Sequence, residues 1–388
     1  MVAALVGVTL GLTSLPFYTL GVFARPIAED MGWPQSTVQS GLVFSMIGTV
    51  MVAGLAGWMI DRFGVRRVTL VSQMCLVLGF LLLASQNGDP LMWRASWFLI
   101  AVLGIGTSPL TWSRGIADWF VNARGFALGI ALSGSGITAF AAPPLVDLMI
   151  QAYGWRTGYL AIGAAVLFVA LPTAWLLFHM REPQGPAGQD VKPMPLYGLT
   201  FGEALRGYRF WLILASFAGI SFAIGGSIPN LVPMLKQGGV EHAALYASLL
   251  GVNVIVGRIL AGYLLDRFWA PLVAVAMLAL PATACVLLAL DLSPGIAAAL
   301  VGLAGGAEFD LIAYLCARYF GMRNYGRIYA WQWAGFSLAA GAGSYGFALV
   351  FDATGSYDGA LYAAAGLMGA GGLALLALGR YPQWDIKS

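Results

Sequence analysis

Ionisable side chains inside long apolar stretches are the most informative residues of this sequence. Arg258 follows the apolar run Gly251–Gly257, and Glu308 and Asp310 lie together in a later run. A charged side chain at the centre of a bilayer costs at least ~2.5 kcal/mol, so a residue of this kind indicates a charged partner or a ligand. Arginine suits a carboxylate ligand, because its planar guanidinium donates two parallel hydrogen bonds and stays protonated.

The two acidic residues are expected to have different roles. Glu308 and Asp310 are two positions apart and therefore point to different sides of a helix. Glu308 is nearer the middle of its run, so we expect it to pair with Arg258 and to be a candidate proton carrier, with a permanent structural ion pair as the alternative. Asp310 is expected to belong to structure near the cytoplasmic end and is the second candidate for proton coupling.

A second arginine, Arg114, also falls inside an apolar run. It precedes Asp118 by four residues, which is the spacing of neighbours on one helix face. We expect a structural ion pair there, and a contact with substrate remains open.

The composition limits the class of protein. Of the 388 residues, 60% are hydrophobic and 10% are charged, whereas soluble proteins carry roughly 25% charged residues. A net charge of +3 without a basic stripe argues against nucleic-acid binding. The three cysteines fit no metal or redox spacing, and the sequence contains no phosphate-binding loop or nucleophile motif. We therefore expect no metal, no cofactor and no enzymatic activity.

The apolar runs predict an all-α membrane protein. Runs of about 20 residues without alternation indicate membrane-spanning helices rather than a barrel. The twelve expected spans are 2–24, 39–60, 68–86, 95–117, 125–149, 156–179, 208–234, 243–265, 270–290, 295–317, 328–350 and 358–379.

The basic residues predict the orientation of the chain. With the N-terminus in the cytoplasm, fourteen of the 20 Lys and Arg residues lie on the cytoplasmic side, four on the other side and two inside spans. Since cytoplasmic loops are enriched in Lys and Arg, both termini are expected in the cytoplasm.

Internal repetition divides the chain into two halves. Gly57–Phe63 returns as Gly262–Phe268, and Ala117–Phe120 returns as Ala317–Phe320. Both copies face the cytoplasm, so the repeat is parallel, an arrangement associated with alternating-access carriers. We expect an N-terminal six-helix half at 1–179, a cytoplasmic linker at 180–207 and a C-terminal six-helix half at 208–388.

The first repeated segment also carries a family resemblance. Gly57–Arg67 reads G-W-M-I-D-R-F-G-V-R-R and resembles the signature loop of the major facilitator superfamily, and the resemblance extends over the whole chain. It implies the major facilitator fold, with charged pairs at the cytoplasmic face that form in one conformation and break in the other. Simple anchoring of the helix ends by positive charge is the alternative. The candidate gating residues are Asp61, Arg62, Arg66, Arg67, Asp266 and Arg267.

A finer resemblance indicates a substrate class. The stretches 118–156 and 306–321 resemble the bacterial branch of the monocarboxylate porter and oxalate–formate antiporter families, which implies small organic anions as substrates. The position of Arg258 resembles that of the helix-8 arginine of monocarboxylate porters, which implies contact with the substrate. Two positions depart from the animal members: Val254 replaces an Asp and Tyr18 replaces a Lys, although Tyr18 could still donate a hydrogen bond to a carboxylate. The candidate substrate-binding residues are Arg258, Tyr18, Asn253, Gln332 and Arg114.

These observations lead to a functional expectation. The chain is expected to be a monomeric, proton-coupled carrier of small monocarboxylates in a bacterial inner membrane. An organic anion exchanger is the nearest alternative, because exchange needs the arginine but no titrating carboxylate. An exporter of apolar compounds would not need Arg258. A receptor or channel would not need two equivalent halves.

Overall fold

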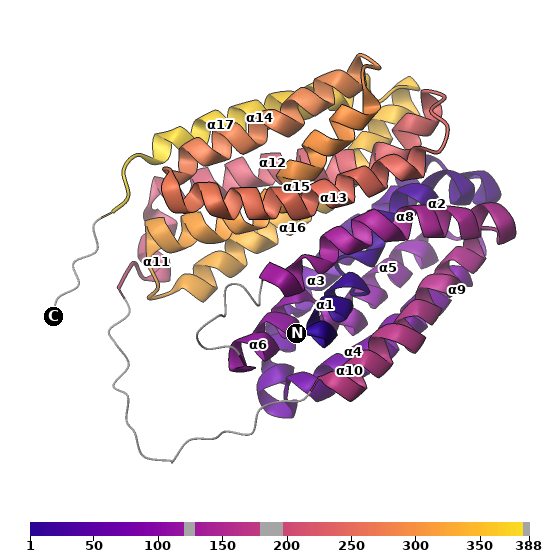
Figure 1. The fold of residues 1–388 in the computed structure, drawn as a ribbon, viewed down its shortest axis with the longest axis horizontal. Helices are drawn as coiled ribbons and strands as arrows, with labels where there is room; N and C mark the ends of the chain where they lie inside the picture. The colour runs from indigo at the N-terminus through magenta and orange to yellow at the C-terminus, as the bar shows by residue number, and fades with distance from the viewer. Residues whose placement is uncertain (120–128, 179–196, 383–388) are drawn as a thin grey trace.

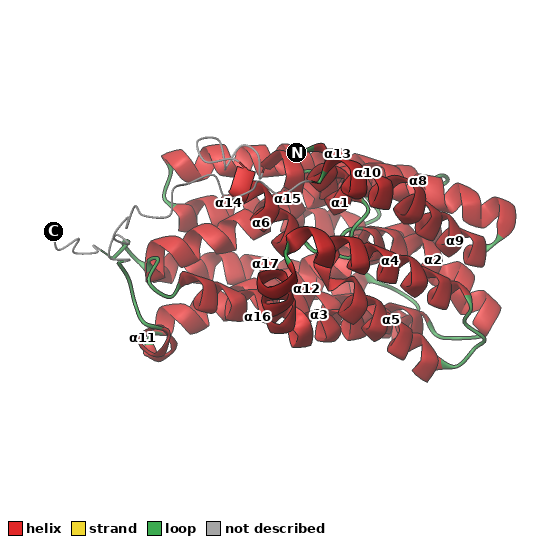
Figure 2. Cartoon of the chain, turned by 90° about the horizontal axis from the view of Figure 1, so that it is seen from below, coloured by secondary structure: helices red, strands yellow, loops and turns green. Residues whose placement is uncertain are grey.

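The computed structural model describes residues 1–119, 129–178 and 197–382. Eleven helical segments in these ranges are long and apolar enough to cross a membrane. Together with the broken first span, they confirm the expected all-α fold. The helices run roughly along the long axis of the molecule in both views, and the two halves lie side by side (Figures 1 and 2).

The N-terminal half contains the first six expected spans. Two of its helices, α4 and α9, begin directly after a glycine with positive φ, Gly64 and Gly154, where the chain reverses. Its elements are α1 (Val2–Thr9), α2 (Leu15–Met31), α3 (Gln35–Phe63), α4 (Val65–Ala84), α5 (Pro90–Gly104), η1 (Ile105–Thr107), α6 (Pro109–Trp119), α8 (Gly134–Tyr153), α9 (Trp155–Ala165), η2 (Val166–Ala170) and α10 (Leu171–Leu177).

The C-terminal half contains the other six spans, which are less interrupted. Its elements are α11 (Phe201–Arg206), α12 (Tyr208–Gln237), α13 (Ala243–Arg267), α14 (Ala270–Ala289), α15 (Pro294–Phe320), α16 (Tyr325–Thr354), α17 (Asp358–Leu375) and η3 (Leu376–Leu378).

Two spans of the N-terminal half are broken near mid-length, which the hydropathy pattern did not predict. The expected span 2–24 forms α1 and α2, and the expected span 95–117 forms α5, η1 and α6. The two breaks contact each other, because the backbone N–H of Leu12 donates to the Thr107 hydroxyl at 3.0 Å. The hydroxyl of Thr138 in α8 donates to the carbonyl of Thr9. Side chains thus satisfy backbone groups that the breaks release, as a membrane interior requires.

Part of the region expected to be a free linker packs on the C-terminal half. Tyr197 accepts backbone hydrogen bonds from Met322 and Arg323, and Gly198 forms an isolated bridge with Gly321. Thr200 and Glu203 then form a capping box at the start of α11. Residues 179–196 of the expected linker lie outside the described ranges.

The two ends of the molecule differ in how the halves meet. We call the end with residue 1, the α3–α4 turn and α11 the linker end, and the opposite end, with the α2–α3 and α16–α17 turns, the far end (Figure 1). The hydrogen bonds and ion pairs that described residues form between the halves lie in the far-end part of their helices.

Candidate substrate and coupling site

Arg258 is placed by a close approach of α13 and α15. A Cβ on Gly257 would lie 2.0 Å from the carbonyl oxygen of Leu303, and one on Gly306 would lie 2.0 Å from that of Val254. Only glycine allows these backbones to pack so closely. Arg258 is nine residues from the end of α13, which places it ~13 Å from the linker end of that helix. The arginine therefore lies inside the span, alongside α15.

The ion-pair partner of Arg258 is Asp310 and not Glu308, which corrects the sequence-based expectation. Arg258 Nε lies 3.6 Å from Asp310 Oδ2 and donates a 3.5 Å hydrogen bond to the carbonyl of Gly306. The Arg258 side chain is 13% exposed and that of Asp310 is 37% exposed. Asp310 is thus part of the site rather than of separate structure near the helix end, and more of its side chain is exposed than of the Arg258 side chain.

Glu308 is more deeply buried than Asp310. Only 6% of Glu308 is exposed, and its Oε2 has no hydrogen-bond partner among the described residues. It lies within electrostatic range of Arg258. The two carboxyl groups therefore flank one guanidinium, but in different surroundings, as their two-residue spacing predicted.

Tyr18 brings the N-terminal half to this cluster. It lies in the first turn of α2, directly after the break in the first span, and its hydroxyl is within electrostatic range of both Arg258 and Glu308. The break matters because a discontinuous helix near mid-membrane is the usual setting of a transporter binding site. Tyr18, Arg258, Glu308 and Asp310, which we call the central cluster, come from both halves of the molecule.

Two other candidate substrate-binding residues face elsewhere. Asn253 donates to the carbonyl of Leu249 in its own helix, and its Cβ packs toward Gly302 of α15. Gln332 is fully buried and donates to the carbonyl of Phe210, which connects α16 to α12. Both side chains thus form a hydrogen bond within the C-terminal half, and their contact with substrate stays a prediction.

The candidate gating residues lie at the linker end, and the contacts found for Arg62, Arg66 and Arg267 among the described side chains stay within one half. Arg62 lies over the rings of Trp58 and Phe63 at 5.9 Å, and Arg267 lies over the ring of Tyr263 at 4.0 Å. Arg66 donates to the carbonyl of Trp175, and Arg67 and Asp266 are exposed.

Two predicted site residues, Asp61 and Arg114, are described by their backbones alone. The backbones of Asp61 and Arg114 belong to α3 and α6. Their side chains lie outside the described part of the structure, as does the segment 120–128.

At the far end, Asp352 links the two halves, a contact that was not predicted from the sequence. Pro34 precedes α3 and provides no side-chain cap. Instead, Asp352 of α16 accepts hydrogen bonds from the backbone N–H groups of Gln35 at 3.0 Å and Ser36 at 2.8 Å. A carboxylate at a helix N-terminus satisfies free amides and interacts favourably with the helix dipole. The C-terminal half thus caps a helix of the N-terminal half.

A buried amide network joins the halves one turn deeper. Gln39 donates to the side-chain oxygen of Asn230 at 3.1 Å and accepts a 2.5 Å hydrogen bond from the Ser344 hydroxyl. Asn230 in turn donates to the carbonyls of Gly226 and Ser344. All three side chains of this network are buried. Since buried polar groups are costly when unpaired, this network favours the closed far end.

An ion pair adds a third far-end connection. Lys236 of α12 lies 2.9 Å from Asp147 of α8, with 28% and 10% of the two side chains exposed. This pair joins residues 89 positions apart and was not predicted from the sequence.

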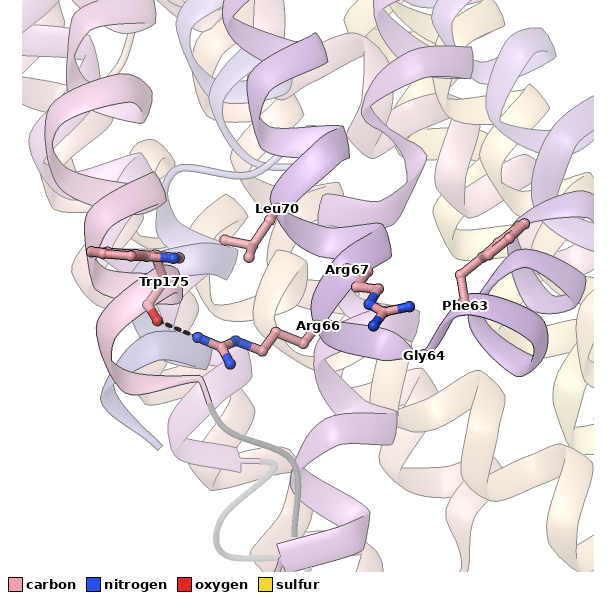
Figure 3. A pocket seen from close by; sticks show the side chains of 6 residues that line it. All are labelled: Phe63, Gly64, Arg66, Arg67, Leu70 and Trp175. Atoms are coloured by element: carbon pink, nitrogen blue, oxygen red, sulfur yellow. Dashed lines mark hydrogen bonds between the residues drawn. The ribbon is translucent and has the colours of Figure 1, made fainter. Parts of the chain in front are cut away.

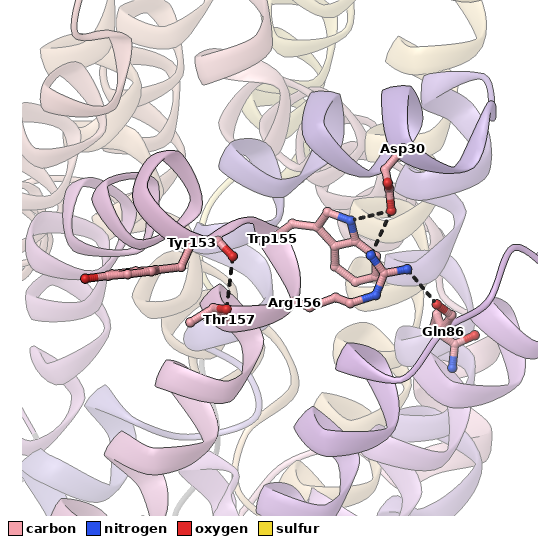
Figure 4. Close-up of polar contacts among 6 residues, drawn as sticks. All are labelled: Asp30, Gln86, Tyr153, Trp155, Arg156 and Thr157. Atoms are coloured by element: carbon pink, nitrogen blue, oxygen red, sulfur yellow. Dashed lines mark hydrogen bonds and ion pairs between the residues drawn. The ribbon is translucent and has the colours of Figure 1, made fainter.

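The N-terminal half has its own polar cluster at the far end. Asp30 accepts hydrogen bonds from Trp155 and Arg156, each at 2.9 Å, and Arg156 also donates to the carbonyl of Gln86 (Figure 4). These donors hold the pKa of the Asp30 carboxyl below its usual value, and the Trp155 hydrogen bond is the largest cause. The cluster ties the ends of α2 and α4 to the start of α9.

Comparison with known proteins gives the family. Residues 6–344 match the Major Facilitator Superfamily, so the chain belongs to this family of membrane transporters. The chain is 28% identical to the probable sulfoacetate transporter SauU of Cupriavidus necator over 64% of this chain and 61% of that protein. It is 34% identical to monocarboxylate transporter 12-B of Danio rerio over 44% of this chain and 43% of that protein.

The fold has a close counterpart among solved structures. The chain superimposes on a crystal structure of a mutant of the nucleoside transporter NupG with a TM-score of 0.76, covering 97% of this chain and 99% of that one, at 12% identity. At this identity the likeness establishes the fold. The protein is therefore a multi-pass membrane transporter of the major facilitator fold, and neither the family nor the fold is that of an enzyme.

Proposed function

We propose that this protein transports a small organic anion, a monocarboxylate, together with a proton. The observation that carries the proposal is Arg258, an arginine inside a span with its terminal nitrogens free of hydrogen-bond partners among the described residues. A substrate carboxylate would accept hydrogen bonds from this free fork. The similarity to proteins named as monocarboxylate and sulfoacetate transporters supports an anionic substrate.

The two carboxyl groups provide the link to protons. Asp310 is the resident counter-ion of Arg258, so an arriving carboxylate competes with it and adds a negative charge to the cluster. The added charge favours uptake of a proton by one of the two carboxyl groups. Glu308 is the proposed carrier, because an ionised carboxylate with an unpartnered oxygen inside the membrane would be costly.

The transport cycle follows from the contacts between the halves. We place both termini and the linker end in the cytoplasm of a bacterial cell, in agreement with the distribution of Lys and Arg. The far-end contacts then close the periplasmic side, and substrate leaves toward the cytoplasm. In the opposite state the linker ends approach, and Asp61, Arg62, Arg66, Arg67, Asp266 and Arg267 are the proposed gate. The monomer, with its 1–179 and 208–388 halves, is the proposed functional unit.

A binding screen tests the substrate class. Purified wild-type protein is heated with a panel of monocarboxylic acids and with their amides, since a ligand that binds the folded state raises the melting temperature. We expect stabilisation by at least one acid and by none of the amides. Arg258→Gln should weaken that acid's binding about 10- to 100-fold, as loss of a charge-assisted contact of about 1.5–3 kcal/mol implies.

Two controls complete the screen. Arg258→Lys keeps the charge but loses the fork, so its affinity should fall between those of the wild type and Arg258→Gln. Arg206→Gln removes an exposed arginine of α11 and should bind like the wild type. Native affinity in a folded Arg258→Gln protein would place the anion site elsewhere.

A further inference from the structure

A basic pocket lies on the surface of the N-terminal half, away from the central cluster. It has a volume of about 360 Å³ and is lined by Phe63, Gly64, Arg66, Arg67, Leu70 and Trp175 (Figure 3). These six residues bring two positive charges and no negative one. The pocket lies at the linker end, where the α3–α4 turn meets the end of α10.

Only one of the nitrogen atoms of the Arg66 guanidinium forms a hydrogen bond with another described residue. One terminal nitrogen donates to the carbonyl of Trp175 at 2.7 Å, which fixes the guanidinium against α10. Its Nε is shielded from water and has no hydrogen-bond partner within the described ranges. A guanidinium with one terminal nitrogen hydrogen-bonded to the protein keeps its other terminal nitrogen as a donor for an acceptor in the pocket.

The start of α4 adds donors to the same place. Gly64 precedes this 20-residue helix, and no described side chain caps it. The first backbone N–H groups of a helix lack partners inside the helix, and they attract anions. With Arg67 on the other side of the pocket (Figure 3), the site combines two guanidinium groups with a helix N-terminus, a donor set that suits a phosphate group.

The apolar part of the pocket distinguishes a lipid from a free ion. Trp175 is 61% exposed and Phe63 is 46% exposed, and the neighbouring Leu176 and Leu177 also show most of their surface. In a membrane protein such side chains face acyl chains, and aromatic rings favour the level of the headgroups. Arginine side chains next to exposed apolar side chains, at the end of the membrane spans, are the arrangement expected for binding of an anionic lipid.

We propose that this pocket binds the phosphate of an anionic phospholipid headgroup, with Arg66 and Arg67 as its ligands. The lipid would contact both α4 and α10, which belong to the N-terminal half, and would not contact the C-terminal half. Arg66 and Arg67 are also among the proposed gating residues, so lipid binding is measured directly and not through transport.

Native mass spectrometry of the detergent-purified full chain tests the proposal. The protein is titrated with phosphatidylglycerol and, separately, with phosphatidylcholine. We expect phosphatidylglycerol to bind about tenfold more tightly to the wild type. The double variant Arg66→Gln/Arg67→Gln should lose this preference, whereas Arg206→Gln, the same charge change at an exposed site of the other half, should keep it.

A single variant and a second ligand complete the experiment. Arg67→Gln alone changes an exposed side chain, so it should fold normally and lose part of the preference. Equal binding of the two lipids by the wild type would overturn the proposal, as would an unchanged preference in both Arg67→Gln and the double variant. Thermal stabilisation by inorganic phosphate equal to that by phosphatidylglycerol would reject a lipid as the occupant.

Discussion

At the scale of single residues, the central cluster places one arginine and two ionisable carboxyl groups inside the membrane span. The sequence alone identified Arg258, Glu308 and Asp310, because ionisable residues stand out in an apolar run. The sequence analysis assigned Glu308 as the counter-ion of Arg258, which was wrong. The counter-ion depends on the direction of the Arg258 side chain, which extends along α15 to the carbonyl of Gly306. The close approach of α13 and α15 at their glycines sets the direction of this side chain. The spacing of residues along one helix does not predict such an approach between two helices.

Asp310 is expected to compete with substrate for the arginine. Asp310→Asn removes the competing charge but leaves a residue of the same size, so carboxylate affinity should rise by about two- to tenfold. Titration of the stabilising acid from the binding screen gives this affinity directly. Weaker binding in Asp310→Asn, at an unchanged melting temperature, would show that Asp310 holds Arg258 in position rather than competing for it.

Asp30 gives a pH dependence of stability that does not involve transport. Its pKa is lowered in the folded protein, so its stabilising contribution is present above the unfolded pKa of about 4 and is lost as the pH falls through the folded value. Asp30→Asn should lower the melting temperature at neutral pH by an amount equivalent to about 1 kcal/mol or less, since the pair is half exposed.

Melting temperatures of both proteins across the acidic range provide the check. The difference between the wild type and Asp30→Asn should shrink below pH ~4, where the wild-type carboxyl becomes protonated. A difference that stays constant down to the lowest pH would mean that the Trp155–Arg156 cluster does not depend on this charge.

At the scale of the elements, the twelve apolar runs were predictable and their interruptions were not. A window average over 2–24 or 95–117 conceals short breaks, although Gly11, Ser14 and Pro16, and later Gly106 and Pro109, lie at them. Such residues also occur within continuous helices: α12 contains Pro229 and Pro233. Whether a span breaks depends on a hydrogen-bond partner for the backbone group that the break releases. The Thr107 hydroxyl is this partner for the N–H of Leu12.

The cap on α3 is an element-scale contact with a measurable effect on conformation. Asp352→Ala leaves the N–H groups of Gln35 and Ser36 without their carboxylate, and an N-cap of this kind is worth about 1 kcal/mol. Because the cap comes from the opposite half, its loss should shift the population toward a far-end-open state by about fivefold.

Distances between spin labels at the far end measure this shift. Labels at Asn87→Cys and Leu292→Cys, both exposed positions of different halves, should show more of the longer distance in Asp352→Ala than in the unsubstituted background. Asp352→Asn retains a capping oxygen and is the matched control, with a smaller change. Identical distance distributions in all three proteins would mean that the cap contributes nothing to closure.

At the scale of the whole molecule, the parallel repeat accounts for two similar halves that meet around Arg258 and Tyr18. The repeat, the spans and the family were readable from the sequence, because they depend on patterns along the chain. The closed end was not, since its contacts join residues such as Gln39 and Ser344 that are 305 positions apart. The state of the molecule is a property of these long-range contacts.

The most direct test of the proposed mechanism is uptake of the stabilising monocarboxylate into proteoliposomes that carry an imposed proton gradient, with the membrane potential clamped. We predict that the wild type accumulates the acid against its gradient. Glu308→Gln, which cannot release a proton, should exchange labelled for unlabelled acid but should not accumulate it. Undiminished accumulation by Glu308→Gln, or wild-type uptake that requires a counter-substrate and ignores the proton gradient, would contradict the proposed mechanism.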